Sequence, residues 1–250
     1  MGFEPVTLEQ MENVKLLDRM DVKYVIPENK LDTILQNLKK DYRVLQIEGQ
    51  RYSDYRTLYF DTADFKLYRM HHSGMLNRYK VRHRTYVDSN LAFLEVKFKN
   101  NKGRTVKDRR KMLTVPLIWD TDSSHFIHSK TPYHADTLLP SVWVNYRRIT
   151  LVGKLNCERV TIDLDLEFVT NEARKKMDRL VIIEVKQPGR IRTPVLKELR
   201  INKCREGSIS KYCLAVVQMY PMVKKNNFKE KISILNKLTH DNTSDSAANR

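Results

Sequence analysis

Charged and aliphatic residues alternate strictly in several segments of this chain. In residues 78–84, RYKVRHR, a strand would place Lys80, Arg82 and Arg84 in one row, because alternate side chains of a strand share a face. Like charges in such a row destabilise a sheet unless something negative lies opposite them. The segment therefore predicts a strand whose charged face has a negatively charged partner.

The same alternation recurs along the chain. In LEVKFK, Glu95 and Lys97 share a face, and in VIIEVK, Glu184 and Lys186 share a face. The other residues on such faces are Arg19, Asp21, Lys23, Tyr146, Arg148, Arg159, Thr161, Asp163 and Asp165. One interpretation is an antiparallel sheet with one face on a core and one face in water. The excess of Arg and Lys on the charged faces favours another, in which these faces line the inside of a closed barrel that holds a small polyanion.

We therefore expect an α+β fold, with an antiparallel closed β-barrel tunnel of about eight strands and helices packed outside it. The expected strands are 19–26, 51–61, 76–86, 91–99, 104–115, 141–152, 157–169 and 180–186. Helices are expected after Pro27, from Thr62 to Gly74, from Thr193 to about Lys203, and from Ser210 to Pro221. The segment 117–139 is expected to be short helix and loop.

No linker rich in Gly, Ser or Pro divides the chain. We predict one domain over residues 1–222, followed by a polar, partly disordered C-terminal tail over 223–250. The three cysteines are in no CxxC spacing, which favours a reducing compartment. The longest uncharged apolar stretch, 212–223, is too short to span a bilayer. The expected location is cytoplasmic.

The formal net charge of +16 favours a polyanionic partner: nucleic acid, phospholipid headgroups or small phosphates. The chain has no glycine-rich phosphate loop and no nucleophile elbow, so side chains would have to bind any phosphate. The basic run 102–111 fits either a solvated hairpin or a nucleic-acid patch, and no aromatic RNA-stacking pattern accompanies it. The acids Glu95 and Glu184, with Asp163 or Asp165, would offer oxygen ligands to Mg²⁺ or Mn²⁺.

At these residues the chain resembles the VTC domain, the polyphosphate polymerase domain of the vacuolar transporter chaperone complex. This domain belongs to the triphosphate tunnel metalloenzymes, which are related to the CYTH proteins. The resemblance rests on the order and spacing of R-x-R (82–84), E-x-K (95–97), Tyr-x-Arg (146–148), R-x-x-x-D (159–163), I-E-V-K (183–186) and S-K-Y (210–212). It extends from about Arg19 to about Tyr220. It implies a tunnel that binds ATP, triphosphate and polyphosphate.

The resemblance also implies a role for individual residues. The catalytic contacts to the phosphate chain would be Lys23, Arg82, Arg84, Lys97, Arg148, Arg159 and Lys186. The substrate-binding residues would be Tyr146, Ser210 and Lys211, and the metal ligands Glu184 and Glu95. The CYTH opening motif E-x-E-x-K is absent, and Ser208 stands where the polymerases carry another lysine.

The function implied is metal-dependent phosphoryl transfer with Mn²⁺ or Mg²⁺, from the terminal phosphate of ATP to a growing polyphosphate chain. Two alternatives remain open at this point: an inorganic triphosphatase or polyphosphatase, and a polyphosphate-binding module without catalysis. We expect no specific nucleic-acid partner. A membrane-protein partner would place the chain at the cytoplasmic face of a membrane, and the sequence gives no indication of the oligomeric state.

Overall fold

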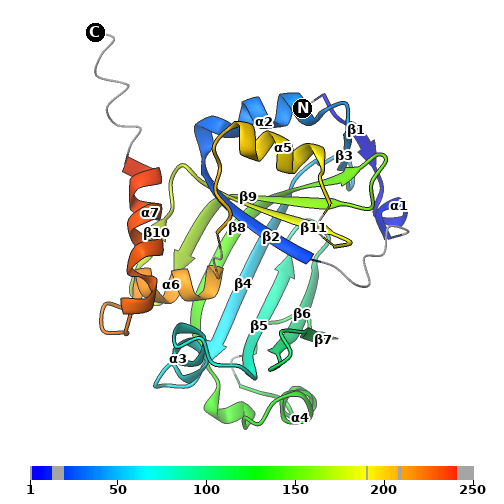
Figure 1. Ribbon diagram of the computed structural model, residues 1–250. Coiled ribbons are helices and arrows are strands. Elements are labelled where there is room, and N and C mark those ends of the chain that lie inside the picture. Colours follow the sequence, from blue (N-terminus) through cyan, green and yellow to red (C-terminus); the bar gives the residue numbers. More distant parts are fainter. Residues whose placement is uncertain (1, 13–19, 117, 190, 208–209, 241–250) are drawn as a thin grey trace.

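The computed structural model describes residues 2–12, 20–116, 118–189, 191–207 and 210–240. Its main feature is an 11-stranded sheet with helices on both sides (Figure 1). The main path runs, in spatial order, through β2 (Met20–Pro27), β11 (Leu180–Gln187), β9 (Arg159–Val169), β8 (Leu139–Gly153), β4 (Ser53–Asp61), β5 (Arg78–Tyr86), β6 (Leu91–Lys99) and β7 (Thr105–Lys111). Every neighbouring pair on this path is antiparallel. The predicted α+β class and the predicted strands are confirmed within the described residues.

Three short strands were not predicted. The strands are β1 (Glu4–Val6), β3 (Tyr42–Leu45) and β10 (Arg174–Lys176). β3 pairs with β8 and with β1, and β10 pairs with β9. Each is too short to show a clear alternation, so long-range pairing rather than local pattern forms them.

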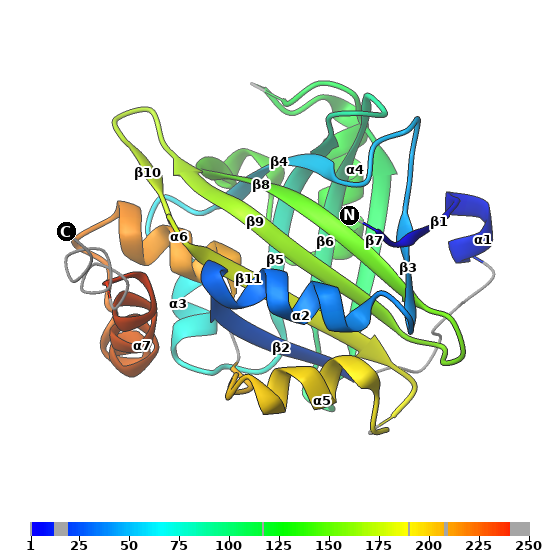
Figure 2. The ribbon, with the colours of Figure 1, turned by 90° about the horizontal axis from the view of Figure 1, so that it is seen from above.

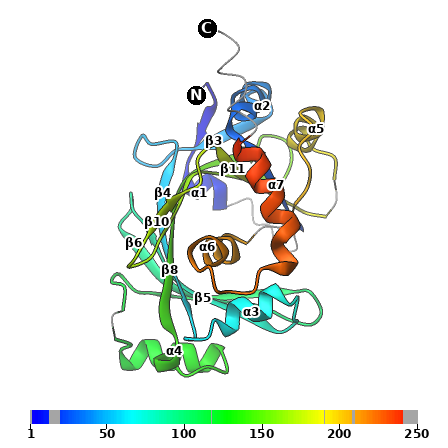
Figure 3. The same ribbon diagram turned by 90° about the vertical axis from the view of Figure 1, so that its left-hand side faces the viewer.

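The expected closure into a barrel is not found. Within the described residues, β2 and β7 are the two edges of the path and do not pair with each other. Part of the free edge of β2 is already occupied, because Tyr24 forms an antiparallel bridge with Glu206 and the Gly207 amide donates to the Lys23 carbonyl at 2.8 Å. The sheet is instead strongly curved and open (Figure 3).

Helices α2 (Leu31–Leu38) and α5 (Pro194–Ile201) cover the convex face over β2, β11 and β9 (Figure 2). The apolar row of α2 is fully buried, as its spacing predicts. It packs on alternate aliphatic residues of the strands, such as Ile162 and Ile183. Burial of this side fixes which strand residues face the other way.

Helix α4 (Thr121–Lys130) covers the convex face over β4, β5 and β6, where Ile127 packs with Phe60, Val81 and Leu94. The remaining helices are α1 (Leu8–Glu12), α3 (Lys66–His72), α6 (Lys211–Met219) and α7 (Lys229–His240). No helix in the described ranges has both the length and the apolar character needed to cross a membrane.

Helix α6 lies on the concave side of the sheet (Figure 3), where it packs on Val144, Phe168 and Ile182. Asp61 at the end of β4 holds it in place. This buried carboxylate accepts hydrogen bonds from the Leu67 and Tyr68 amides at the start of α3 and from the Tyr212 hydroxyl of α6. The N-terminus of α6 is thereby directed at the charged part of the concave face.

Candidate active site

The concave face carries most of the charged residues that alternate along the strands. We call its cations the basic face: Lys23, Lys80, Arg82, Arg84, Lys97, Lys107, Arg148, Arg159, Lys186 and Lys211. They are contributed by β2, β5, β6, β7, β8, β9, β11 and the first residue of α6. Curvature brings these distant segments to one side of the sheet.

On β5 and β6, Glu95 is surrounded by cations. It lies opposite Arg82, whose Nε is 2.6 Å from Oε2 of Glu95, and Arg84 lies 4.0 Å from the same oxygen. Lys107 of β7 contacts the other oxygen. Burial would raise the pKa of Glu95, which is 1% exposed, but the charges of Arg82, Arg84 and Lys107 lower it to about 2. Glu95 therefore stays ionised and fixes three cations of the basic face.

At the other end of the sheet, Glu184 lies between two lysines. Lys23 on β2 is its cross-strand neighbour, with Nζ 2.5 Å from Oε1, and Lys186 contacts Oε2. Burial acts to raise the pKa of Glu184, and the charges of Lys186 and Lys23 outweigh it, so that its pKa is strongly lowered. The carboxylate is ionised throughout the physiological pH range.

In the middle of the sheet, Arg148 binds Asp163 in a bidentate manner, with Nε–Oδ1 and Nη2–Oδ2 distances of 2.6 and 2.9 Å. Lys211 also contacts Oδ2 of Asp163. Burial would raise the pKa of Asp163, but the charges of Arg148 and Lys211 lower it to about 2. Asp163 thus connects the sheet to the N-terminus of α6.

Ser210 is the N-cap of α6 and accepts a hydrogen bond from the Cys213 amide at 3.3 Å. Its hydroxyl also accepts one from the Lys80 Nζ at 2.7 Å. Lys80 forms no ion pair with a carboxylate in the part of the chain that the structure describes. Burial lowers its pKa. Lys80 is therefore a basic group of this face that no carboxylate of the described residues neutralises.

Lys97 on β6 shows how far the sheet curls. Its side chain is exposed, yet the surrounding protein partly desolvates it, and this effect, with the charges of Lys80, Arg82 and Lys23, lowers its pKa to about 8. The influence of Lys23 is informative, because β2 and β6 lie near opposite ends of the strand order. The charges on the two halves of the basic face therefore influence one another.

Aromatic rings support the arginines. Tyr55 and Tyr146 are stacked with ring centroids 5.0 Å apart, and the guanidinium carbons of Arg84 and Arg148 lie 5.6 and 5.0 Å from the Tyr55 ring. Cations over ring faces gain cation–π attraction and lose side-chain freedom. The rings therefore preorganise two of the arginines.

The structure places the predicted phosphate contacts and the acids Glu95, Asp163 and Glu184 on the concave side, but not Asp165. Arg159 lies at the far end of β9, opposite Lys186, with Nη1 3.8 Å from the Met11 sulfur. Arg19 and Ser208 are outside the described residues. The loss of one phosphate contact, expected because residue 208 is a serine, therefore stays a prediction.

Two site residues went unassigned in the sequence. Lys80 belongs to the row of alternating cations on β5, which was a signal for it. Lys107 belongs to the basic run 102–111, and only its pairing opposite Lys97 shows that it faces inward.

The metal prediction has a different outcome for each acid. Glu95 and Glu184 lie on strands near opposite ends of the sheet and are engaged by different cations. Asp165 is not on the inner face: a β-bulge interrupts the pairing of β9 with β8, Asp165 has a φ of 52°, and its side chain is 65% exposed. No group of three His, Cys, Asp or Glu side chains that could hold a metal occurs among the described residues.

Solved structures with a similar chain path include HpAC1 from Hippeastrum, which has a dominant triphosphatase activity. It is 14% identical with a TM-score of 0.48, and the match covers 80% of this chain and 96% of that one. PH1819 from Pyrococcus horikoshii OT3 is 11% identical with a TM-score of 0.46, covering 82% of this chain and 99% of that one. The S. pombe RNA triphosphatase Pct1 is 10% identical with a TM-score of 0.29, covering 90% of this chain and 88% of that one.

No curated protein matches the chain. The VTC domain family matches residues 18–220, which include the whole main path of the sheet, the basic face and α6. The match extends over most of the 250 residues, and its limits agree with the segment that carries the alternating charges. The chain belongs to the VTC domain family.

Proposed function

We propose that the basic face binds a linear chain of phosphates and supports metal-dependent phosphoryl transfer from ATP to polyphosphate. The observation that carries the proposal is the charge balance of the concave face. Its cations outnumber its acids Asp21, Glu95, Asp163 and Glu184, and each of the last three carboxylates is already shared by two or three cations. The excess positive charge needs a bound polyanion.

Phosphoryl transfer suits such a face because it needs positioning and charge stabilisation more than a covalent nucleophile. Arg82, Arg84 and Arg148 are held by carboxylates and by tyrosine rings, so their guanidinium groups would not have to reorganise when a phosphate chain binds. Lys80, Lys97 and Lys23 approach from both halves of the sheet. The terminal phosphates would lie between the two halves.

Glu184 fits a metal better than Glu95 does. Mg²⁺ is commonly held by one or two carboxylates together with substrate phosphates and water. The Glu184 side chain is 17% exposed and ionised, whereas Glu95 is 1% exposed and enclosed by cations. We assign Glu184 to the metal and Glu95 to the positioning of Arg82, Arg84 and Lys107. Glu184 would hold the metal, which would offset the negative charge of the bound phosphates.

The lysines beside Glu184 set a condition on this assignment. Lys23 and Lys186 occupy both carboxylate oxygens, and their charges repel a bare divalent cation. A phosphate chain would attract both ammonium groups and free an oxygen of Glu184. We therefore expect the metal to enter together with the phosphate chain rather than before it.

Incubation of the protein with ATP and either Mn²⁺ or Mg²⁺ tests whether polyphosphate or water accepts the transferred phosphoryl group. A gel then reports chain length and a separate assay reports free phosphate. A ladder of polyphosphates supports the polymerase, and phosphate without a ladder supports the triphosphatase alternative. Binding of triphosphate without either product would leave a binding module. The cytoplasmic location and the membrane-protein partner stay predictions.

A further inference from the structure

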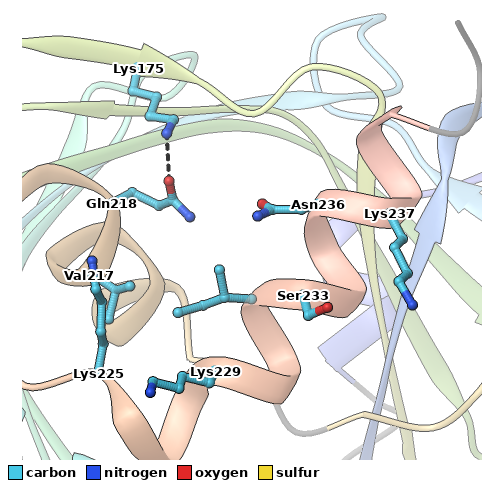
Figure 4. Close-up of a pocket in the computed structure, with 9 residues that line it drawn as sticks. Lys175, Val217, Gln218, Lys225, Lys229, Ser233, Asn236 and Lys237 are labelled. Carbon is cyan, nitrogen blue, oxygen red and sulfur yellow. Dashed lines mark hydrogen bonds between the residues drawn. The ribbon is translucent and has the colours of Figure 1, made fainter.

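A second basic site lies away from the basic face. A cavity of about 710 Å³ lies between the C-terminal half of α6, one face of α7, and Lys175 of β10 (Figure 4). Its lining residues are Lys175, Val217, Gln218, Lys225, Lys229, Ile232, Ser233, Asn236 and Lys237. None of them belongs to the basic face.

The cavity has an unbalanced charge. Its lining includes four lysines and no acidic side chain among the described residues. Lys175 donates to Oε1 of Gln218 at 2.6 Å, and neither Lys225 nor Lys229 forms an ion pair in the part of the chain that the structure describes. Figure 4 shows Lys237 directed away from Gln218. Lys175, Lys225 and Lys229 are therefore the cations that would contact a ligand in the cavity.

The chemistry of the lining selects a class of ligand. Lysine binds phosphate as a point charge, and several lysines around one cavity favour an anion that carries several negative charges. The side chains of Gln218, Ser233 and Asn236 add hydrogen-bonding groups, and Val217 with Ile232 forms an apolar patch. The volume is in the range of small-molecule sites, roughly 300–1,000 Å³, and is too small for a folded partner.

We propose that this cavity binds a small anion with two or more phosphate groups, at a site separate from the basic face. Helix α6 links the two sites, because Ser210 and Lys211 at one end contact the basic face while Val217 and Gln218 line the cavity. A ligand held against α6 would restrain the helix that supplies Lys211. The proposal does not depend on which reaction the basic face supports.

The test is calorimetric titration with tripolyphosphate in the absence of divalent cations. Wild type should show two classes of site, and Lys225→Ala/Lys229→Ala should weaken one class by roughly tenfold or more, since each lost charge-assisted hydrogen bond costs about tenfold or more. Lys224→Ala, a neighbouring lysine that does not line the cavity, is the charge-matched control and should keep both classes. Lys97→Ala should weaken only the other class.

Unchanged binding in Lys225→Ala/Lys229→Ala overturns the second site. Unchanged binding in Lys97→Ala instead counts against the basic face, so the two failures are distinguishable. A second measurement avoids substitutions: acetylation of wild-type lysines by acetic anhydride, read by mass spectrometry. Tripolyphosphate should protect Lys225 and Lys229 severalfold relative to Lys224, and equal labelling with and without the anion would contradict the proposal.

Discussion

Glu184 on β11 lies directly opposite Lys23 on β2, and the Lys23 Nζ is 2.5 Å from Oε1 of Glu184. Lys186 contacts the second oxygen of the same carboxylate. A carboxylate that we assign to a metal is thus held, without ligand, by two ammonium groups that we assign to phosphate. A bound phosphate chain would attract both ammonium groups and leave the carboxylate free for a metal. This change of partners makes the role of Glu184 testable.

Glu184→Gln should abolish metal-dependent turnover, because a neutral amide is a poor ligand for a hard divalent cation. It should also destabilise the unliganded protein by about 2 kcal/mol, since Lys23 and Lys186 lose their shared counter-charge in a partly buried setting. Activity against Mn²⁺ concentration and thermal melting check both effects. Wild-type activity at every metal concentration would remove Glu184 from the metal site.

Lys80→Ala and Arg82→Ala form a matched pair on one face of β5. Both should weaken tripolyphosphate binding, since both remove a cation of the basic face. Only Arg82→Ala should destabilise the protein strongly, by about 3 kcal/mol in unfolding free energy, because it removes the guanidinium group that donates to Oε2 of the buried Glu95. Lys80→Ala should melt at or above the wild-type temperature, since it relieves repulsion.

The quantity to compare is the difference in melting temperature between Lys80→Ala and Arg82→Ala. Melting curves with and without tripolyphosphate measure it, because a ligand of the folded state raises the melting temperature. If Lys80→Ala melts well below wild type, a partner that neutralises Lys80 exists and the charge excess at this position is smaller than we argue.

Binding should depend on pH through Lys97, whose pKa is lowered to about 8. Above this pH the ammonium loses its proton, so affinity for tripolyphosphate should fall as the pH rises from about 7 to 9. Stability should change in the opposite direction. The folded pKa lies below the ordinary lysine pKa of about 10.5, so the folded protein binds fewer protons and stability rises with pH between about 8 and 10.5.

Lys97→Gln tests the assignment, since the variant should lose most of the pH dependence of binding between 7 and 9. Titration of tripolyphosphate affinity against pH in the two proteins is the measurement. Parallel profiles would show that another group is responsible.

Ser210→Ala should destabilise the protein by about 1 kcal/mol, the usual cost of losing an N-cap side chain. It should also lower turnover, because Lys80 loses its hydrogen-bond acceptor and the start of α6, with Lys211, is less firmly held. Ser210→Thr, which keeps the hydroxyl, is the control. A Ser210→Ala protein with wild-type melting and turnover would show that the cap does not position α6.

The alternating pattern predicted the strands and their inner faces because one side of each strand packs on α2, α5 or α4. It failed at Asp165, where a bulge and a positive φ turn the side chain to solvent. A one-residue insertion in the pairing leaves no trace in the periodicity of a single strand.

Two features depend on contacts between segments far apart in the chain: whether the sheet closes or stays open, and the inward position of Lys107. The edge of β2 is bonded partly by residues 206–207, and nothing in the local pattern of either segment indicates this. The sequence also could not show that Glu95 is enclosed by cations, since Lys107 reaches it only through the pairing of β6 with β7. Local alternation determines the faces, and long-range pairing determines which charges meet.

The central claim is that the positive charge is gathered on a concave face for a narrow phosphate chain rather than spread over an open surface. A DNA duplex is roughly 20 Å across, far wider than an extended phosphate chain that can lie within a strongly curved sheet. Competition against a fluorescent ATP analogue, with Mg²⁺ or Mn²⁺ present and at two salt concentrations, tests the claim directly. We predict that tripolyphosphate displaces the analogue at concentrations where duplex DNA does not, with a modest loss of affinity in higher salt. Equal displacement by duplex DNA, falling steeply with salt, would contradict the account.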